Sequence, residues 1–325
     1  MSATVRVGTC SWADDTLTKV WYPKRIRTGE ARIRHYAERF DTVEANSTYY
    51  RLPDAELVAN WAERVPDGFT MHVKAFGLMT RHPVKLEALP EDLRDVMPVD
   101  ERGRVDRPPR ELRAEVFRRF HRALEPLRER GKLGGILLQF PSYVVSKPAS
   151  LDYLEWAVAQ LDGDEPLVEF RHRSWLDDEN RGATLAFLES LGATNVVVDA
   201  PKTEAKNLVP TVVARTSETA YVRFHGRNAS TWNKRTGSAA ERFDYLYSEQ
   251  ELEEWVQPLR ELAAESESVY AMFNNNGRST MPATGLEGLE PEEIAGDPAK
   301  GEVAQAPANA LMLRRLLQAA GVPVS

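Results

Sequence analysis

The chain has 325 residues, 42% of them hydrophobic, and a formal net charge of -7. This length accommodates one large α/β domain or two ordinary ones. Basic residues are interspersed with Asp and Glu, which argues against long nucleic acids and anionic membranes as partners. Cys10 is the single cysteine, so no intrachain disulfide can form. No apolar run approaches the roughly 20 residues that span a bilayer, and no charged leader with an apolar signal segment precedes the first strand, so we expect a cytoplasmic protein.

Short apolar runs alternate with segments of helical period, which is the pattern of βα units around a parallel sheet. A helix is predicted after most of these runs, and only the segment after Asp199 is too short and polar to form a good one. The eight predicted strands are Val5–Cys10, Thr42–Asn46, Phe69–Ala75, Ile136–Phe140, Leu167–Arg171, Asn195–Asp199, Ala220–His225 and Val269–Asn274.

Helical periodicity is clearest in residues 33–40 and 252–259, where apolar side chains recur three, four and seven positions apart. Each segment therefore presents one apolar stripe to a sheet. Asp54 provides an N-cap signal, and Ser248 with Glu251 forms a capping-box pattern. Further helices are predicted near 54–65, 111–130, 148–162, 182–192 and 307–320.

Eight strands with interleaved helices most simply form a (β/α)8, TIM-barrel-like fold, with the chain as one domain over residues 1–325. A typical barrel of roughly 250 residues leaves about 75 residues for elaborated loops. The stretches 76–110, 226–247 and 276–306 are polar or rich in Pro and follow strands three, seven and eight. That order places them on the face where barrel enzymes build their active sites. A doubly wound open sheet with an added subdomain is the alternative topology.

Side chains alternate along a strand, so each predicted strand has one face for the outer helices and one for the barrel interior. In the segment DTVEANSTYYRLP (41–53), Val43 and Ala45 suit the helices, which turns Glu44 and Asn46 inward. The same rule assigns a polar set to the interior, near the strand ends where catalytic groups of barrels lie. Its main polar members are Glu44, Asn46, Lys74, Gln139, Glu169, Arg171, Asn195, Asp199, Arg223 and His225, with Asn274 at the end of the last strand.

Burying an unpaired charge costs several kcal/mol, so these groups must pair with one another, meet water in a cavity or meet a ligand. The set holds three carboxylates and three cationic side chains, and its histidine is of a type that titrates near neutral pH. One interpretation is an ion-pair lattice that closes the top of the barrel. The other is a functional site in which Lys74 and the arginines bind an anionic group while a carboxylate and His225 transfer protons.

Seven segments resemble, in order, the signature segments of the YecE-like family of domains of unknown function. They run from Val7 to the last predicted helix and cover nearly the whole chain, which makes the resemblance far more specific than any one segment. The resemblance implies a TIM-barrel-like fold, but it implies no particular reaction, cofactor or substrate. The segments are VGTCSW (7–12), FDTVEANSTYYRLP (40–53), LLQFP (137–141), VEFRHRSW (168–175), YVRFHGR (221–227), FNNN (273–276) and APANA (306–310).

Two stretches depart from the pattern of that family. Residues 277–305 separate FNNN from APANA, two segments that usually follow one another closely, and residues 83–110 are longer and more charged than the family leads us to expect. The covering of the barrel mouth, and with it the size of the substrate, can therefore differ in this member.

We expect an enzyme that acts on a small anionic or polyhydroxylated substrate by acid/base, hydrolase-type chemistry at the mouth of the barrel. Glu44, Glu169 and Asp199 are the candidate catalytic carboxylates, and His225 is the candidate proton shuttle. Substrate-binding roles are assigned to Asn46, Lys74, Gln139, Arg171, Arg223 and Asn274.

Two further hypotheses stay open. One is a metal-dependent phosphodiester hydrolase in which Glu169, Asp199 and His225 hold Zn or Mn. No HxH or HExxH spacing supports this hypothesis, and our main expectation includes no metal and no cofactor. The other is a non-catalytic barrel that binds a ligand or serves as a scaffold for a partner.

Overall fold

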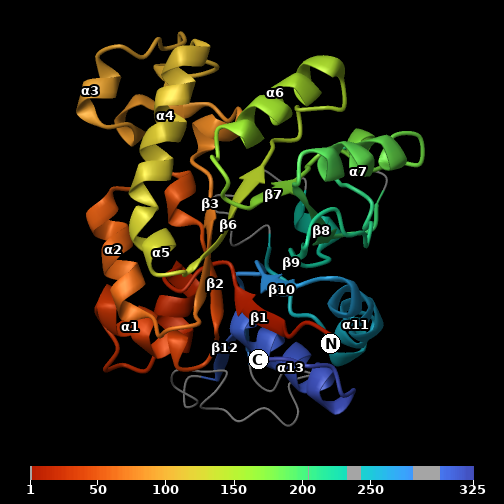
Figure 1. Cartoon of the computed structure of the whole chain (residues 1–325). Coiled ribbons are helices and arrows are strands. Elements are labelled where there is room, and N and C mark those ends of the chain that lie inside the picture. Colours follow the sequence, from red (N-terminus) through yellow and green to blue (C-terminus); the bar gives the residue numbers. More distant parts are fainter. Residues whose placement is uncertain (1, 204, 233–242, 281–300) are drawn as a thin grey trace.

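Eight parallel strands close into a barrel in the order β1-β10-β9-β8-β7-β6-β3-β2, and helices cover its outside (Figure 1). The computed structural model describes residues 2–203, 205–232, 243–280 and 301–325. The TIM-barrel-like fold and all eight predicted strands are confirmed. The strands are β1 (Val5–Thr9), β2 (Thr42–Ala45), β3 (Thr70–Lys74), β6 (Leu133–Gln139), β7 (Pro166–Glu169), β8 (Thr194–Asp199), β9 (Thr219–Phe224) and β10 (Ser268–Phe273).

Helices follow most of the barrel strands, as the periodicity predicts. The α-helices are α1 (Gly29–Ala37), α2 (Ala55–Arg64), α3 (Glu91–Arg94), α4 (Arg110–Ala123), α5 (Glu125–Glu129), α6 (Pro148–Ala159), α7 (Arg181–Ser190), α8 (Ala229–Trp232), α10 (Glu249–Glu253), α11 (Val256–Glu265) and α13 (Gln305–Ala319). Short π or 3-10 turns lie at Leu17–Trp21, Ser47–Tyr49, Gly77–Thr80, Leu86–Ala88 and Arg173–Trp175. Among the described residues between β8 and β9, no helix forms, in agreement with the sequence.

The predicted helix starts are confirmed by their caps. The side chain of Asp54 accepts a hydrogen bond from the Leu57 amide (2.8 Å), and Ser248 and Glu251 form a capping box. The predicted helix 111–130 is divided into α4 and α5, with Pro126 in the first turn of α5. Because proline has no amide hydrogen to donate to the preceding turn, it favours a new helix start at this point.

The outer faces of the strands form the main core with the helices. Val43 and Ala45 of β2 and Val168 of β7 belong to this core, as the alternation predicts. A second, smaller apolar cluster fills the barrel interior and includes Leu137 and Tyr221. The predicted faces of β2 and β7 are therefore confirmed, and Glu44 and Glu169 lie inside the barrel.

The predicted face of β8 is wrong. Val196 and Val198 belong to the interior cluster, whereas Val197 packs in the outer core, so Asn195 and Asp199 point outward. The run Asn-Val-Val-Val-Asp carries valine on both faces, and hydrophobicity alone therefore does not choose between them. Asn195 instead donates to the carbonyl oxygen of residue 214 (3.4 Å) in the connection that follows β8.

The barrel interior is closed beneath the polar residues by aromatic packing. His72 of β3 lies edge-on to Tyr221 and Tyr270, with ring centres 4.8 and 4.2 Å apart, respectively. Beside it the register of β3 and β6 shifts, and Gly134 lies so close to the His72 side chain that a Cβ atom would not fit. Aromatic side chains therefore pack beneath the polar cluster, on the side away from the carboxyl ends of the strands.

The predicted long loops contain small elements of their own. Within 76–110, β4 (Val84–Lys85) pairs with β5 (Arg104–Val105), and within 276–306, β11 (Arg278–Thr280) pairs with β12 (Glu302–Ala304), both antiparallel. Parts of the predicted loops 226–247 and 276–306, namely residues 233–242 and 281–300, lie outside the described residues. The described helices include none of the length and apolar character that a membrane crossing requires.

Candidate functional site

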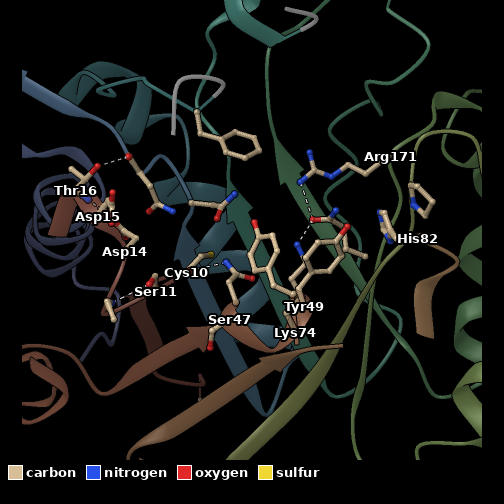
Figure 2. A pocket seen from close by; sticks show the side chains of 18 of the residues that line it. Cys10, Ser11, Asp14, Asp15, Thr16, Ser47, Tyr49, Lys74, His82 and Arg171 are labelled. Carbon is tan, nitrogen blue, oxygen red and sulfur yellow. Dashed lines mark hydrogen bonds between the residues drawn. The ribbon is translucent and has the colours of Figure 1, made fainter. Parts of the chain in front are cut away.

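A cavity of about 600 Å³ lies at the carboxyl ends of the barrel strands. Its walls come from the last residues of β3 and β6 and from the segments that follow β1, β2, β3, β6, β7, β8 and β10, together with Trp232 and Phe243 after β9. Figure 2 shows Lys74, Tyr49 and Arg171 toward one side of this cavity and Cys10, Ser11 and Asp14 toward the other. This is the face where barrel enzymes place their active sites.

Two cationic side chains converge on one neutral oxygen in the cavity. Lys74 Nζ and Arg171 Nη2 lie 3.0 and 3.2 Å from Gln139 Oε1. Lys74 also lies over the Tyr49 ring, 4.5 Å from its centre, and Arg171 lies 5.7 Å from the centre of the Trp232 ring. Both cations therefore have an aromatic neighbour that stabilises positive charge.

A buried ion-pair lattice lies under these cations. Arg223 joins the two inward carboxylates: its Nη2 lies 2.6 Å from Glu44 Oε1, and its Nη1 binds Glu169. The Tyr221 hydroxyl donates to the other oxygen of Glu44 (2.9 Å). Glu44, Glu169 and Arg223 are almost completely inaccessible to solvent. Both carboxylates thus carry out a structural task, since they neutralise a buried guanidinium.

Glu169 is held in its ionised form. Burial pushes the pKa of its carboxyl group upward, but the charges of Arg171 and Arg223 outweigh burial and hold this pKa well below its usual range. Arg171 pairs with Glu169 through its Nε and at the same time lines the cavity. Arg171 is therefore the link between the buried lattice and the open site.

His225 lies against the same carboxylate, with its Nε2 3.3 Å from Glu169 Oε1 and 3.0 Å from Arg171 Nη2. Burial and then the charge of Arg171 lower its pKa to about 3, so the ring is neutral near pH 7. A guanidinium group only donates hydrogen bonds, so Nε2 faces a donor in Arg171, and on the other side of the ring the Asn274 amide nitrogen Nδ2 lies 2.9 Å from Nδ1. This environment does not favour a proton shuttle near neutral pH.

Asp199 lies outside this cluster, which corrects its expected position. Its oxygens accept hydrogen bonds from Tyr247 (2.7 Å), Trp255 (2.9 Å) and Arg227 (2.7 Å). All three partners come from segments outside the barrel interior, as the reversed face of β8 requires. Asp199 therefore tethers the outer segments to β8, and the proposed metal set of Glu169, Asp199 and His225 is not assembled.

The other nine predicted site residues gather at the barrel mouth in two layers. The open layer lines the cavity and consists of Asn46, Lys74, Gln139, Arg171 and Asn274. The buried layer lies below it and consists of Glu44, Glu169, Arg223 and His225. Asn46 also donates to the carbonyl oxygen of Cys10 (2.7 Å), which joins the ends of β2 and β1.

Asp14 is a cavity residue that the sequence analysis missed. Its Oδ1 accepts hydrogen bonds from the Thr16 and Leu17 amides (2.8 and 3.0 Å), whereas its Oδ2 is buried without a hydrogen-bond partner in the described part of the chain. Burial raises its pKa to about 6. The sequence does contain a signal, because the acidic pair Asp14-Asp15 follows the first strand closely.

Metal ligation gains no support from the described residues. Across residues 2–203, 205–232, 243–280 and 301–325, no three His, Cys, Asp or Glu side chains are grouped so that they could hold one ion. The carboxylates nearest the cavity floor already neutralise Arg223 and Arg171.

Comparison with known proteins agrees with the resemblance and the fold. A family model described as "Protein of unknown function DUF72" matches residues 6–289. The chain is 31% identical to the UPF0759 protein YunF of Bacillus subtilis over 292 residues, which is 88% of this chain and 94% of that protein. It is 42% identical to the UPF0759 protein YecE of Escherichia coli K12 over 48 residues, which is 15% of this chain and 18% of that protein.

Two solved structures have the same fold. A DUF72 family protein of Thermotoga maritima superposes with a TM-score of 0.70 at 28% identity, covering 97% of this chain and 99% of that chain. A DUF72 family protein of Enterococcus faecalis superposes with a TM-score of 0.73 at 24% identity, covering 97% of this chain and 96% of that chain.

Proposed function

Because this chain belongs to the DUF72 family, whose description assigns no reaction, we propose from the site itself that the protein is an enzyme acting by acid/base chemistry on a small anionic substrate. The reaction takes place in the cavity at the mouth of the barrel. Lys74 and Arg171 bind the anionic group, and Asp14, which lines the cavity, is the proton-transfer group.

The observation that carries this proposal is the convergence of Lys74 and Arg171 on Gln139 Oε1. Two cations that share a neutral acceptor provide donors for an anionic oxygen, which binds such donors more strongly than an amide oxygen does. With Lys74 protonated, the five residues Lys74, Arg171, Arg223, Glu44 and Glu169 carry one net positive charge. An anion bound beside Gln139 would neutralise that charge.

The proton-transfer role moves from the buried glutamates to Asp14. Glu44 and Glu169 are bound to Arg223 below the cavity and do not line it, and Glu169 is held ionised. Asp14 lines the cavity, and its pKa of about 6 lies near the pH at which a general acid or base works best. Glu44 and Glu169 position the cations instead.

The volume of the cavity and the residues that line it indicate the size and chemical character of the substrate beyond its anionic group. A cavity of about 600 Å³ suits a small molecule. Tyr49, Trp232 and Phe243 supply aromatic surface to the cavity. Such rings stack on the flat or apolar face of a sugar or another planar group. Phosphate esters and glycosides with an anionic group are therefore the compounds to test first.

An activity screen tests the proposal. Turnover of anionic phosphate esters and glycosides is measured with the full-length protein and with Asp14→Asn and Arg171→Gln. Asp178→Asn and Arg102→Gln, at exposed positions, are the matched controls. We expect Asp14→Asn to lower kcat and Arg171→Gln to raise KM, with the controls unchanged. Full turnover in Asp14→Asn would remove Asp14 from the reaction, and an anion that binds without turnover of any compound would favour the non-catalytic barrel.

A further inference from the structure

The Lys74 amine is unusual among the groups that line the cavity. Its Nζ has a neutral acceptor, Gln139 Oε1 at 3.0 Å, and an aromatic neighbour, the Tyr49 ring at 4.5 Å. Within the described part of the chain, no carboxylate lies at ion-pair distance from this Nζ. Figure 2 shows the side chain directed toward the cavity beside Tyr49, so a small molecule can reach the amine.

The surroundings favour a neutral amine at moderate pH. Burial, followed by the charge of Arg223, lowers the pKa of Lys74 to about 8. With that pKa, about half of the amine is neutral at pH 8, whereas an exposed lysine is almost entirely protonated there. Only the neutral amine has the electron pair that attacks an electrophile.

Two other buried groups show why Lys74 is the reactive one. Lys132 is also buried, but its Nζ donates to the carbonyl oxygens of Ala62 and Val65 (2.9 and 2.7 Å), a role that needs the amine hydrogens. Cys10 lines the cavity, but burial and then the charge of Glu44 raise the pKa of its thiol well above the usual value. The thiol is therefore protonated and weakly nucleophilic.

We propose that Lys74 forms an imine with the carbonyl group of a small anionic aldehyde or ketone whose anionic group pairs with Arg171. This inference rests on the proposed function, because it needs the anion to bind at the cationic side of the cavity. It names the substrate class more closely: an oxo acid or a phosphorylated carbonyl compound.

The bond changes balance without an oxidant or a reductant. The Lys74 nitrogen attacks the carbonyl carbon, a C–N bond forms, and the carbonyl oxygen takes a proton to give a carbinolamine. The nitrogen loses a proton and the hydroxyl oxygen takes a second one, so that the C–O bond breaks with its electrons leaving on water as the nitrogen electron pair forms the C=N bond. The sum is neutral amine plus carbonyl plus one proton giving protonated imine plus water.

The site accommodates the protonated imine as well as the free ammonium. The imine nitrogen retains one hydrogen, which can donate to Gln139 Oε1 in place of the ammonium hydrogen seen there. The positive charge stays over the Tyr49 ring. Arg171, 3.2 Å from the same Gln139 oxygen, is placed to bind an anionic group a short distance from the new C=N bond.

Reductive trapping tests the inference. The full-length protein is incubated with pyruvate or glyceraldehyde 3-phosphate and sodium cyanoborohydride, which donates hydride to the imine carbon and leaves a stable secondary amine. Peptide mass spectrometry then locates the adduct. We expect the adduct at Lys74. The total amount of trapped adduct should fall at least about tenfold in Lys74→Arg, which keeps the charge but cannot form an imine. It should not fall in the exposed control Lys85→Arg.

The pH profile and matched alcohols complete the test. Trapping at Lys74 should level off above about pH 8, whereas trapping at exposed lysines continues to rise toward their pKa near 10.4. Lactate and glycerol 3-phosphate, which share the anion but lack the carbonyl, should slow trapping at Lys74. If these alcohols raise the melting temperature but no adduct forms at Lys74, the imine is refuted and anion binding stands. If neither the carbonyl compounds nor the alcohols bind, both the imine and the proposed function are refuted.

Discussion

Arg171 and Glu169 form an ion pair that crosses the boundary between the buried lattice and the cavity. Glu169 is fully buried, whereas Arg171 reaches the cavity and donates to Gln139 beside Lys74. The carboxylate therefore fixes the guanidinium from below, at the edge of the cavity. The ion-pair lattice, one of the two alternatives at the level of sequence, is present, and the proposed anion site lies directly above it.

The lattice predicts a large stability effect at Arg223. Arg223→Met leaves the buried carboxylate of Glu44 without its cation and removes one of the two arginines that pair with Glu169. We expect the free energy of unfolding to fall by about 3–5 kcal/mol, the range for breaking a buried ion pair. Urea denaturation measures it, and the exposed Arg102→Gln is the control. Adding Glu44→Gln to Arg223→Met should restore part of the loss. Equal stability of wild type and Arg223→Met would contradict the lattice.

Asp14 predicts a pH dependence of stability. Its pKa is raised from 3.8 to about 6 in the folded protein, so the folded state binds the Asp14 proton more tightly than the unfolded state does. The stability that this protonation contributes is present below about pH 4 and is lost as the pH rises through 6. Asp14→Asn cannot lose a proton and retains an oxygen to cap Thr16 and Leu17. The unfolding free energy of Asp14→Asn relative to wild type should therefore increase between pH 4 and pH 6.

Urea titrations at several pH values measure this difference. Asp178→Asn, which replaces an exposed carboxylate, provides the reference curve and should show no comparable increase. A relative stability of Asp14→Asn that stays constant from pH 4 to pH 7 would show that the Asp14 carboxyl group is not desolvated in the folded protein.

Asp199 should affect stability without affecting the cavity. Asp199→Asn removes the charge that pairs with Arg227 and weakens the hydrogen bonds from Tyr247 and Trp255. We expect a loss of about 1–3 kcal/mol in the free energy of unfolding. Because Asp199 points away from the barrel interior, binding of inorganic phosphate should stay as in wild type. Weaker phosphate binding in a folded Asp199→Asn variant would place this residue back in the functional site.

The strand positions and most of the faces could be predicted because one face of each strand is strongly apolar. Val43 and Ala45 choose the outer face of β2 and thereby turn Glu44 inward. β8 lacks this asymmetry, since valines lie on both of its faces, and its direction is set by packing partners far away in the sequence, such as Tyr247 and Trp255 for Asp199.

The chemistry of the site was harder to predict than its location. Alternation along a strand tells which residues point inward but not how deep each lies, so the burial of Glu169 and the exposure of Lys74 to the cavity depend on tertiary packing. Asp14 lies in an irregular segment, where alternation gives no information. Its raised pKa comes from burial by neighbouring loops, which a sequence pattern does not describe.

Anion binding at Lys74 and Arg171 is the central claim, and isothermal titration calorimetry with inorganic phosphate at pH 7 tests it most directly. We expect one binding site in wild type and an affinity lower by roughly tenfold or more in Arg171→Gln and in Lys74→Gln, because each variant removes a charge-assisted hydrogen bond. Arg102→Gln should bind as wild type does. No binding to wild type, or equal affinity in wild type and both cavity variants, would show that Lys74 and Arg171 do not form an anion site.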